Sequence, residues 1–251
     1  MNFAMNKKDE FSPIKQTLDP IYVGSSVIGI KFDKGIIIAC DVRLNYGHLC
    51  KHMDVEGRLL RLTERTIFGY SGEYSDTQET SRILKSMILD DQLSSGENSF
   101  LGPVELTNYL AELHYYQRNR MNPFLNSIVS GGINWNGEPV LLNIDQFGTL
   151  LTGNYFTTSM SHYFCNAILR EDYDKDPKSV NLDKALVIIK KCFEVMLYRH
   201  LLAGNVIKYM VMKTEDGGKT IQFEENKFEV TGKWDYNMWK NMGNENAYLI
   251  S

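Results

Sequence analysis

Two closely spaced runs of apolar, mostly β-branched residues dominate the first part of the chain. Ser26–Asp33 and Ile36–Cys40 flank an Asp-Lys-Gly turn, and this arrangement predicts a β-hairpin. The second run is apolar throughout, so we expect both of its faces to be buried. Residues 1–23 are polar and include Pro13 and Pro20, which predicts an extended leader rather than a packed element.

Strand and helix periodicities follow one another in blocks along the rest of the chain. Asp76, with Glu79 three residues later, predicts the N-cap of the first helix. The order of strands, two helices, strands, two helices and strands is not the strict alternation of a parallel sheet, but two sheets between two helical layers satisfy it. The further strands are predicted at Thr66–Ser71, Ser127–Ile133, Val140–Ile144, Val206–Lys213 and Thr220–Phe223, and the helices at Asp76–Leu89, Val104–Arg120, Ser159–Arg170 and Leu182–Leu202.

Length and composition fit a single α/β (α+β) domain. The 251 residues, 43% of them hydrophobic, can bury a sizeable core without disulfides or metals. The net charge of −4 gives no reason to expect nucleic acid or an acidic membrane surface as a partner. We see neither a secretory signal nor the roughly 20 apolar residues that a bilayer-spanning helix needs, and therefore expect a protein of the cytoplasm and nucleus.

The cysteines and glycine pairs do not indicate a cofactor. None of the four cysteines has CxxC spacing, which is typical of free thiols in a reducing compartment. The segment His48–His52 contains two histidines and Cys50, but no second ligand pair follows at a known spacing, so a polar loop is favoured over a metal site. The Gly-Gly pairs at 131–132 and 217–218 lack the Lys-Ser/Thr of a phosphate-binding loop.

The predicted hairpin carries a family resemblance. Gly24–Asp41 resembles the N-terminal signature of proteasome β subunits: a strand that begins with Ser or Thr, a glycine turn, and an apolar strand that ends in Ala-x-Asp. The resemblance covers about residues 17–235. It continues at Tyr46-Gly47, Phe68–Gly72, Asn122–Phe124, Ile128–Gly132 and Thr152-Gly153.

This resemblance implies a four-layer αββα sandwich, the N-terminal-nucleophile hydrolase fold. It also implies a place in a ring of seven different β subunits, with two such rings between rings of α subunits, in the 20S core particle that degrades ubiquitinated proteins. The leader Thr17–Val27, the helical segment Cys192–Arg199 and the region around Trp234 resemble one non-catalytic type of member. We divide the chain accordingly into a propeptide at 1–16, a β-type domain at 17–235 and an interaction tail at 236–251.

Part of the family's catalytic set is retained in this sequence. An N-terminal nucleophile needs a hydroxyl and a free α-amine on the same residue, because an amide nitrogen is not a base. Ser25 matches the catalytic threonine, and Gly24 before it matches the cleavage site. Asp41 matches the family's aspartate, Gly72 matches the glycine whose N–H lines the oxyanion hole, and Ser159 keeps a supporting hydroxyl.

Other positions of the set have changed. The family's lysine, aligned through the following Leu59–Leu62 with one inserted residue, falls on Arg58, and a gapless count gives Gly57. Arginine stays protonated, with a pKa above about 12, and cannot shuttle a proton near neutrality. The supporting aspartate and serine become His200 and Ala203. We interpret Asp41 and Arg58 as a remnant ion pair.

Glu73 and Tyr74 follow Gly72, where active subunits tend to carry small residues, and we expect their side chains to fill part of the pocket. The leader is expected to be cut before Thr17, between Gln16 and Thr17, which leaves Ser25 inside the chain. Three functions follow: a structural and assembly subunit, an active hydrolase that uses Ser25 after leader cleavage, or a free-standing binding protein of the same fold.

The C-terminal tail favours the structural function. The tail is apolar and aromatic, and such a segment is expected to bury its side chains on a partner or on its own domain. In the resembled type the tail reaches the opposite β ring, and the partners would then be neighbouring β subunits, an α subunit and subunits across the equator. The residues expected in this interface are Trp239, Met242, Tyr248, Leu249 and Ile250.

Overall fold

The hairpin predicted from the first two apolar runs is present in the computed structural model of the chain, which describes residues 21–53, 55, 57–95, 101–215 and 220–233. Strand β2 spans Val27–Phe32 and β3 spans Gly35–Asp41, with Val27 opposite Cys40 and Phe32 opposite Gly35. All seven residues of β3 are buried. The prediction of a strand covered on both faces is confirmed.

The hairpin lies at the centre of the smaller of two sheets. In this five-stranded antiparallel sheet, β3 pairs with β12 and β2 with β11. The two final strands of the chain are longer at their C-terminal ends than the sequence predicted. The order across the sheet is β11 (Tyr155–Thr157), β2, β3, β12 (Val206–Glu215) and β13 (Thr220–Glu229).

Within the described residues, the larger sheet has eight strands. The predicted strands at 66–71, 127–133 and 140–144 form its central part, and short strands that periodicity did not indicate complete it. The order is β10 (Leu150–Thr152), β9 (Pro139–Ile144), β8 (Asn126–Ile133), β7 (Thr66–Glu73), β1 (Tyr22–Gly24), β4 (Leu44–Tyr46) and β5 (Leu49–His52), with β6 (Leu59–Thr63) also paired to β7.

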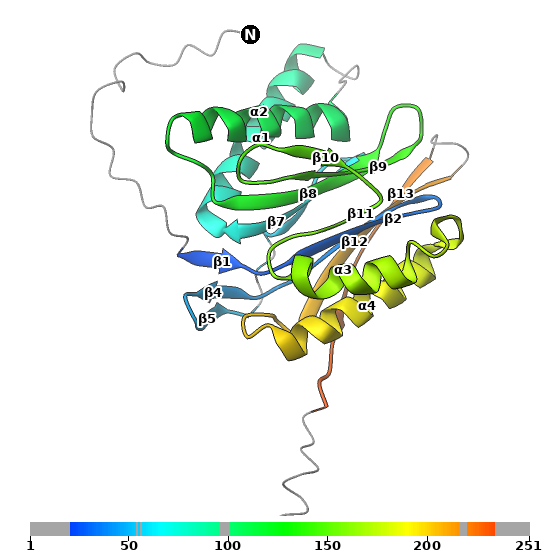
Figure 1. The fold of residues 1–251 in the computed structure, drawn as a ribbon. Helices are drawn as coiled ribbons and strands as arrows, with labels where there is room; N and C mark the ends of the chain where they lie inside the picture. Colours follow the sequence, from blue (N-terminus) through cyan, green and yellow to red (C-terminus); the bar gives the residue numbers. More distant parts are fainter. Residues whose placement is uncertain (1–20, 54, 56, 96–100, 216–219, 234–251) are drawn as a thin grey trace, which may run out of the picture.

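Two pairs of helices cover the outer faces of the sheets. Helices α1 and α2 lie over the larger sheet and α3 and α4 over the smaller one, so that the molecule has four layers in the order αββα (Figure 1). The expectation of two sheets between two helical layers is therefore confirmed. The helices are α1 (Tyr74–Ser95), α2 (Pro103–Asn119), α3 (Ser161–Asp172) and α4 (Leu182–Arg199), with a short 3-10 helix at Pro177–Ser179.

Each interface between layers has its own apolar core. The alternation of side chains along a strand explains how β3 contributes to two of them: Ile37 packs toward α3 and α4, whereas Ile36 and Ile38 point into the space between the sheets. Phe68 and Leu110 belong to the third core, between the larger sheet and α1 and α2.

Three local predictions were wrong. Helix α1 begins at Tyr74, two residues before the predicted N-cap Asp76, whose carboxylate instead accepts a hydrogen bond of 2.7 Å from the Leu125 N–H. The last part of the supposed unpacked leader forms strand β1 within the larger sheet. The segment predicted as a polar loop at 48–52 forms one strand of the β4–β5 hairpin.

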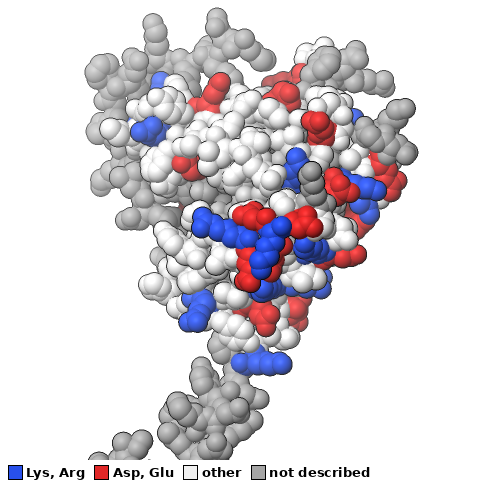
Figure 2. All heavy atoms as spheres, turned by 45° about the vertical axis from the view of Figure 1, so that its right-hand side comes forward, with Lys and Arg blue, Asp and Glu red and all other residues white. Residues whose placement is uncertain are grey.

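The charged surface is mixed in sign. Figure 2 shows acidic and basic side chains intermixed over the lower part of the visible face. Some of these neighbouring opposite charges form surface ion pairs, such as Lys191–Asp172 and Lys213–Glu224. Among the described residues, no helix combines the length and the apolar character needed to cross a bilayer.

Candidate functional site

Ser25 lies where β1 passes into β2, with only 4% of its surface exposed. The preceding strand β1 is inserted between β4 and β7, so that Gly24 lies opposite Leu44 on one side and Gly72 on the other. The nitrogen of Ser25 is therefore a peptide nitrogen at the end of a strand paired on both sides. A chain folded in this way has no free α-amine beside the Ser25 hydroxyl.

Arg58 occupies the space beside Ser25. Its Nη1 lies 2.6 Å from Asp41 Oδ1 and 2.6 Å from the Asp41 carbonyl oxygen. Its Nη2 donates to the Ser25 carbonyl at 2.5 Å, and its Nε to the Tyr70 carbonyl at 3.2 Å. A Cβ on Gly24 would collide with this guanidinium group, so a glycine at this position lets Arg58 pack against the strand. Arg58, and not its neighbour Gly57, supplies the side chain that contacts Asp41.

The environment of Arg58 fixes its charge. Burial by itself would lower the pKa of the guanidinium, but the adjacent Asp41 carboxylate outweighs burial, and the pKa of Arg58 is raised above its ordinary value. The ion pair is almost completely shielded from solvent, with side-chain exposures of 1% and 2%. The predicted remnant ion pair is present, and it cannot exchange a proton near neutrality.

The loop after α4 forms the other side of the site. His200 is the C-cap residue of that helix, and its Nδ1 lies 3.3 Å from Ser25 Oγ. Burial lowers the pKa of His200, although Asp41 acts in the opposite direction, so the imidazole is neutral at pH 7. Ala203 contributes backbone groups: its N–H donates to the His200 carbonyl at 3.0 Å and its carbonyl accepts from Arg43 at 3.3 Å. The Gly204 N–H donates to Asp41 Oδ2 at 2.9 Å.

Gly72 and Ser159 both have unusual backbone conformations. Gly72 has φ +96°, and a Cβ there would collide with the Leu125 carbonyl, so only glycine fits. Ser159 has φ +55° and is exposed at the turn before α3. The hydroxyls that the structure ties to the β1–β2 region are others: Ser26 Oγ accepts from the Ser161 N–H at 3.0 Å, and Thr158 Oγ1 accepts from the Val27 N–H at 2.9 Å.

Sequence reasoning missed Ser26, Thr158 and Ser161 because each carries a common hydroxyl without a motif of its own. Their sequence separations from their partners are large: Ser26 and Ser161 lie 135 positions apart. The pairing of β11 with β2, which places Thr157 opposite Ile28 shortly before α3, brings them together. This network fixes the start of α3 against the strand that follows Ser25.

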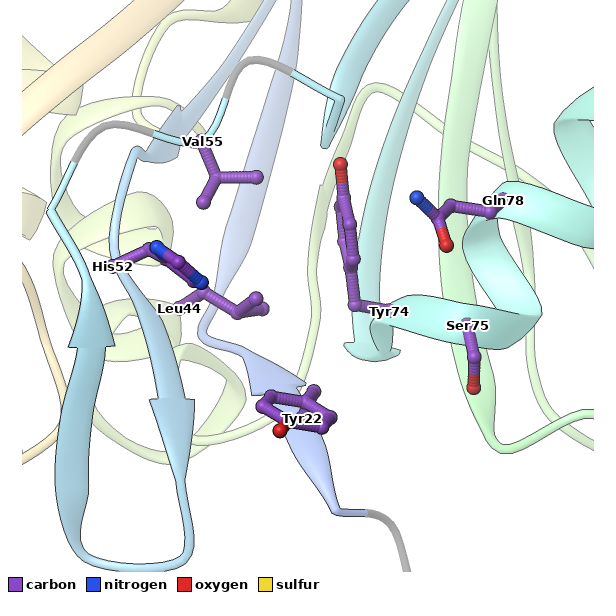
Figure 3. Close-up of a pocket in the computed structure, with 7 residues that line it drawn as sticks. All are labelled: Tyr22, Leu44, His52, Val55, Tyr74, Ser75 and Gln78. Atoms are coloured by element: carbon purple, nitrogen blue, oxygen red, sulfur yellow. The ribbon is translucent and has the colours of Figure 1, made fainter.

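Glu73 and Tyr74 lie at the end of β7 and the start of α1. The Glu73 carboxylate is buried, with 7% exposure, and binds backbone N–H groups of the leader and the first turn of α1. Tyr74 lines an open hollow of about 480 Å³ together with Tyr22 of β1 and His52 of β5 (Figure 3). These two side chains fill space beside the leader strand and not the immediate surroundings of the Ser25 hydroxyl.

The overall comparison with known proteins identifies the family. The model of the proteasome subunit family matches residues 21–212. The chain belongs to the proteasome subunit family. It is 31% identical to proteasome subunit beta type-4 of Xenopus laevis over 82% of this chain and 83% of that protein. It is 36% identical to beta type-4 of Dictyostelium discoideum over 80% of this chain and 76% of that protein, and 30% identical to beta type-7 of Saccharomyces cerevisiae over 90% and 85%.

Membership of the proteasome β subunits gives the chain a place in a protease complex assembled from several subunits. The αββα sandwich described above agrees with the fold that the family resemblance implied. The residues predicted for processing, Gln16 and Thr17, lie outside the described residues. The same holds for the predicted interface tail from Trp239 to Ile250.

The segment His48–His52 does not assemble metal ligands in the structure. Cys50 is exposed on β5, and its sulfur contacts the His52 carbonyl at 3.7 Å and the Met53 sulfur at 3.1 Å. Across the described parts of the chain, no three His, Cys, Asp or Glu side chains are grouped so that they could hold a metal ion. The other three cysteines, Cys40, Cys165 and Cys192, are buried and free, and burial raises the pKa of Cys40 to about 11.

Proposed function

We propose that this chain is a non-catalytic, structural subunit of the proteasome β ring. The observation that carries the proposal is the buried Arg58–Asp41 pair, because the family resemblance aligns Arg58 with the proton-carrying lysine. Arg58 directs its guanidinium nitrogens at the Asp41 carboxylate and at the carbonyls of Asp41, Ser25 and Tyr70. An arginine held in this way stabilises the fold but cannot accept a proton from Ser25.

The loss of this acid–base group has a large expected effect. Removing one such partner typically costs on the order of 10²–10⁴ in rate. In the alignment that the family resemblance implies, the lysine, the supporting aspartate and the supporting serine correspond to Arg58, His200 and Ala203. Because these residues act on the same proton transfer, their losses need not add, but together they leave Ser25 without the family's machinery.

The position of the peptide bond before Ser25, at the end of a strand paired on both sides, supports the same function. Cleavage between Gly24 and Ser25 would have to break a strand that pairs with both β4 and β7. A chain that keeps residues 21–24 in the sheet keeps the Ser25 nitrogen as an amide, which is not a base. The proposed function therefore requires that the mature chain begins upstream of Ile21.

One contact favours an alternative, an active serine hydrolase. Ser25 Oγ lies 3.3 Å from His200 Nδ1, and the neutral imidazole could accept the hydroxyl proton. The hydroxyl is almost fully covered while β1 is in place. The alternative therefore needs prior removal of the leader up to Gly24.

The mature N-terminus decides between the two functions. The intact mass of this chain, measured in the purified particle, is expected to correspond to a start at or near Thr17. The particle is then treated with an electrophilic inhibitor directed at N-terminal nucleophiles, with an active β subunit of the same particle as the positive control. We expect no adduct on this chain. A chain that begins at Ser25, or an adduct that a Ser25→Ala variant lacks, would establish the alternative.

The assembly contacts form the second part of the proposed function. We place the chain at the ring position of its beta type-4 relatives, the seventh in ring order, with two β neighbours, an α subunit and, through the C-terminal tail, subunits of the opposite β ring. A cytoplasmic and nuclear location follows from this assignment. Deletion of residues 240–251 is expected to impair the joining of half-particles, measured by native gel or sedimentation. Normal joining by the truncated chain would remove the tail from the interface.

A further inference from the structure

We propose that Glu73 is a clamp that holds the leader strand β1 in the larger sheet and thereby keeps the peptide bond before Ser25 inaccessible. The inference rests on the proposed function, because it explains how Ser25 stays inside the chain. It assigns to Glu73 a positioning role, since the carboxylate contacts the backbone of the leader and not the Ser25 hydroxyl.

The Glu73 carboxylate has two groups of partners. One oxygen, Oε2, accepts from the Ile21 N–H at 2.5 Å and from the Tyr22 N–H at 3.1 Å. The other, Oε1, accepts from the Ser75 hydroxyl at 3.0 Å and the Ser75 N–H at 3.4 Å. The same side chain thus binds the start of the leader strand and the first turn of α1.

The backbone around Glu73 is itself fixed. The Glu73 N–H donates to the Leu125 carbonyl at 2.9 Å, and Gly72 before it adopts the left-handed conformation that only glycine fits there. The carboxylate also lies at the N-terminus of α1, where the helix dipole favours a negative charge. A rigid, charge-stabilised acceptor can hold the two leader N–H groups more strongly than a neutral side chain would.

The leader strand needs such an anchor because it is short. Strand β1 has three residues, Tyr22–Gly24, and a strand of this length has few hydrogen bonds of its own to hold it in the sheet. Its other end is held by Arg58, which donates to the Ser25 carbonyl. Glu73 and Arg58 therefore fix the leader at both ends, and the peptide bonds between them stay in the sheet.

The hollow beside β1 is lined by residues that bind Glu73. Tyr22, whose N–H binds Glu73, and Ser75, whose hydroxyl binds it, lie on neighbouring elements at the lower edge of the hollow (Figure 3). Leu44 and His52 of the β4–β5 hairpin line the left side of the hollow and face Tyr74 (Figure 3). Residues 21–24 are thus surrounded by β4, β7 and α1, and release of the leader requires that the Glu73 contacts break first.

The test measures hydrogen exchange of the leader amides in the assembled particle. A Glu73→Gln variant keeps the size of the side chain but replaces one acceptor oxygen by an NH₂ group and removes the charge. We expect the exchange of amides in residues 21–24 to become roughly ten- to hundredfold faster, the effect of losing hydrogen bonds to a charged group. Glu79→Gln is the matched control, because it removes the same charge from the exposed Glu79–Arg82 pair on α1 and should leave the leader unchanged.

A second pair of variants changes the leader and leaves Glu73 intact. These variants can test the clamp even if the Glu73→Gln chain does not assemble into the particle. Ile21→Pro removes one N–H donor to Glu73 and should accelerate exchange at Tyr22 and Val23, whereas Ile21→Ala should not. Exchange in the 21–24 segment equal to wild type in Glu73→Gln, or in Ile21→Pro, overturns the clamp. Intact mass separates the two proposals: a wild-type chain that begins at Ser25 overturns the proposed function as well, whereas unchanged exchange in a chain that keeps its leader overturns the clamp alone.

Discussion

The two substituted sides of the Ser25 site differ in how firmly the new residue is held. Arg58 is buried, carries a full charge and makes several short hydrogen bonds to Asp41 and to backbone carbonyls. His200 lies half-buried at the end of α4, is neutral, and contacts Ser25 Oγ at 3.3 Å. Arg58 is part of the buried interior, whereas His200 is partly exposed.

This difference shows how unequally two residues of one site can contribute to stability. Arg58 takes part in a buried ion pair and several backbone hydrogen bonds. His200 makes one longer side-chain contact, to Ser25 Oγ. We therefore expect substitutions on the Arg58 side to affect folding strongly and substitutions on the His200 side to affect it little.

The largest expected effect belongs to Arg58→Met. The variant leaves the Asp41 carboxylate buried without its cation, and breaking a buried pair in this way costs about 3–5 kcal/mol. Urea unfolding of the full chain should show a correspondingly lower midpoint. Arg82→Met removes an exposed ion pair on α1 and serves as the control, with a midpoint near that of the wild type. An unchanged midpoint in Arg58→Met would contradict the structural role of the pair.

A double-mutant cycle measures the interaction energy between Asp41 and Arg58, which we expect to be smaller than the loss of stability in Arg58→Met. Asp41→Asn and Arg58→Met each leave one member of the pair alone, so the double variant should be less destabilised than the sum of the two single variants. For residues in direct contact we expect an interaction energy of about 1–3 kcal/mol. The same cycle on the exposed pair Lys191–Asp172 should give no measurable coupling. Additive effects at Asp41 and Arg58 would show that the two side chains act independently.

The smallest expected effect is that of His200→Gln. At pH 7.5 it removes one neutral contact at a half-exposed site, which changes the free energy of unfolding by less than about 1 kcal/mol. Because burial lowers the pKa of His200, the folded chain binds its proton less readily than the unfolded chain, and stability falls as pH drops below about 6.5.

The pH dependence therefore tests the His200 side directly. Urea unfolding of His200→Gln at pH 7.5 and 5.5 should show a weaker loss of stability in acid than the wild type. Part of the slope should remain, because burial also lowers the pKa of His114 in α2. A slope in His200→Gln identical to that of the wild type would place His200 outside the titrating set.

The main elements of the fold could be predicted because they have strong local signals. The apolar run 36–40 predicted a strand buried on both faces, and β3 confirms it. The short strands β1, β4 and β11 were not predicted, because three residues carry too little periodicity and their pairing partners are distant in the sequence. Asp76 was wrong as a helix cap because Glu73, which precedes the helix, accepts the Ser75 N–H of the first turn.

Residue type alone limits the chemistry available at Arg58, His200 and Ala203, the positions that the family resemblance aligns with the catalytic set. An arginine cannot shuttle a proton near neutrality and an alanine has no hydroxyl, whatever the fold. The contacts of these side chains appear only in the folded chain: Arg58 pairs with Asp41, His200 lies beside Ser25, and Glu73 binds the leader backbone. These contacts join positions 17, 175 and 52 residues apart. No local pattern specifies them, because they depend on how sheets, helices and leader pack together.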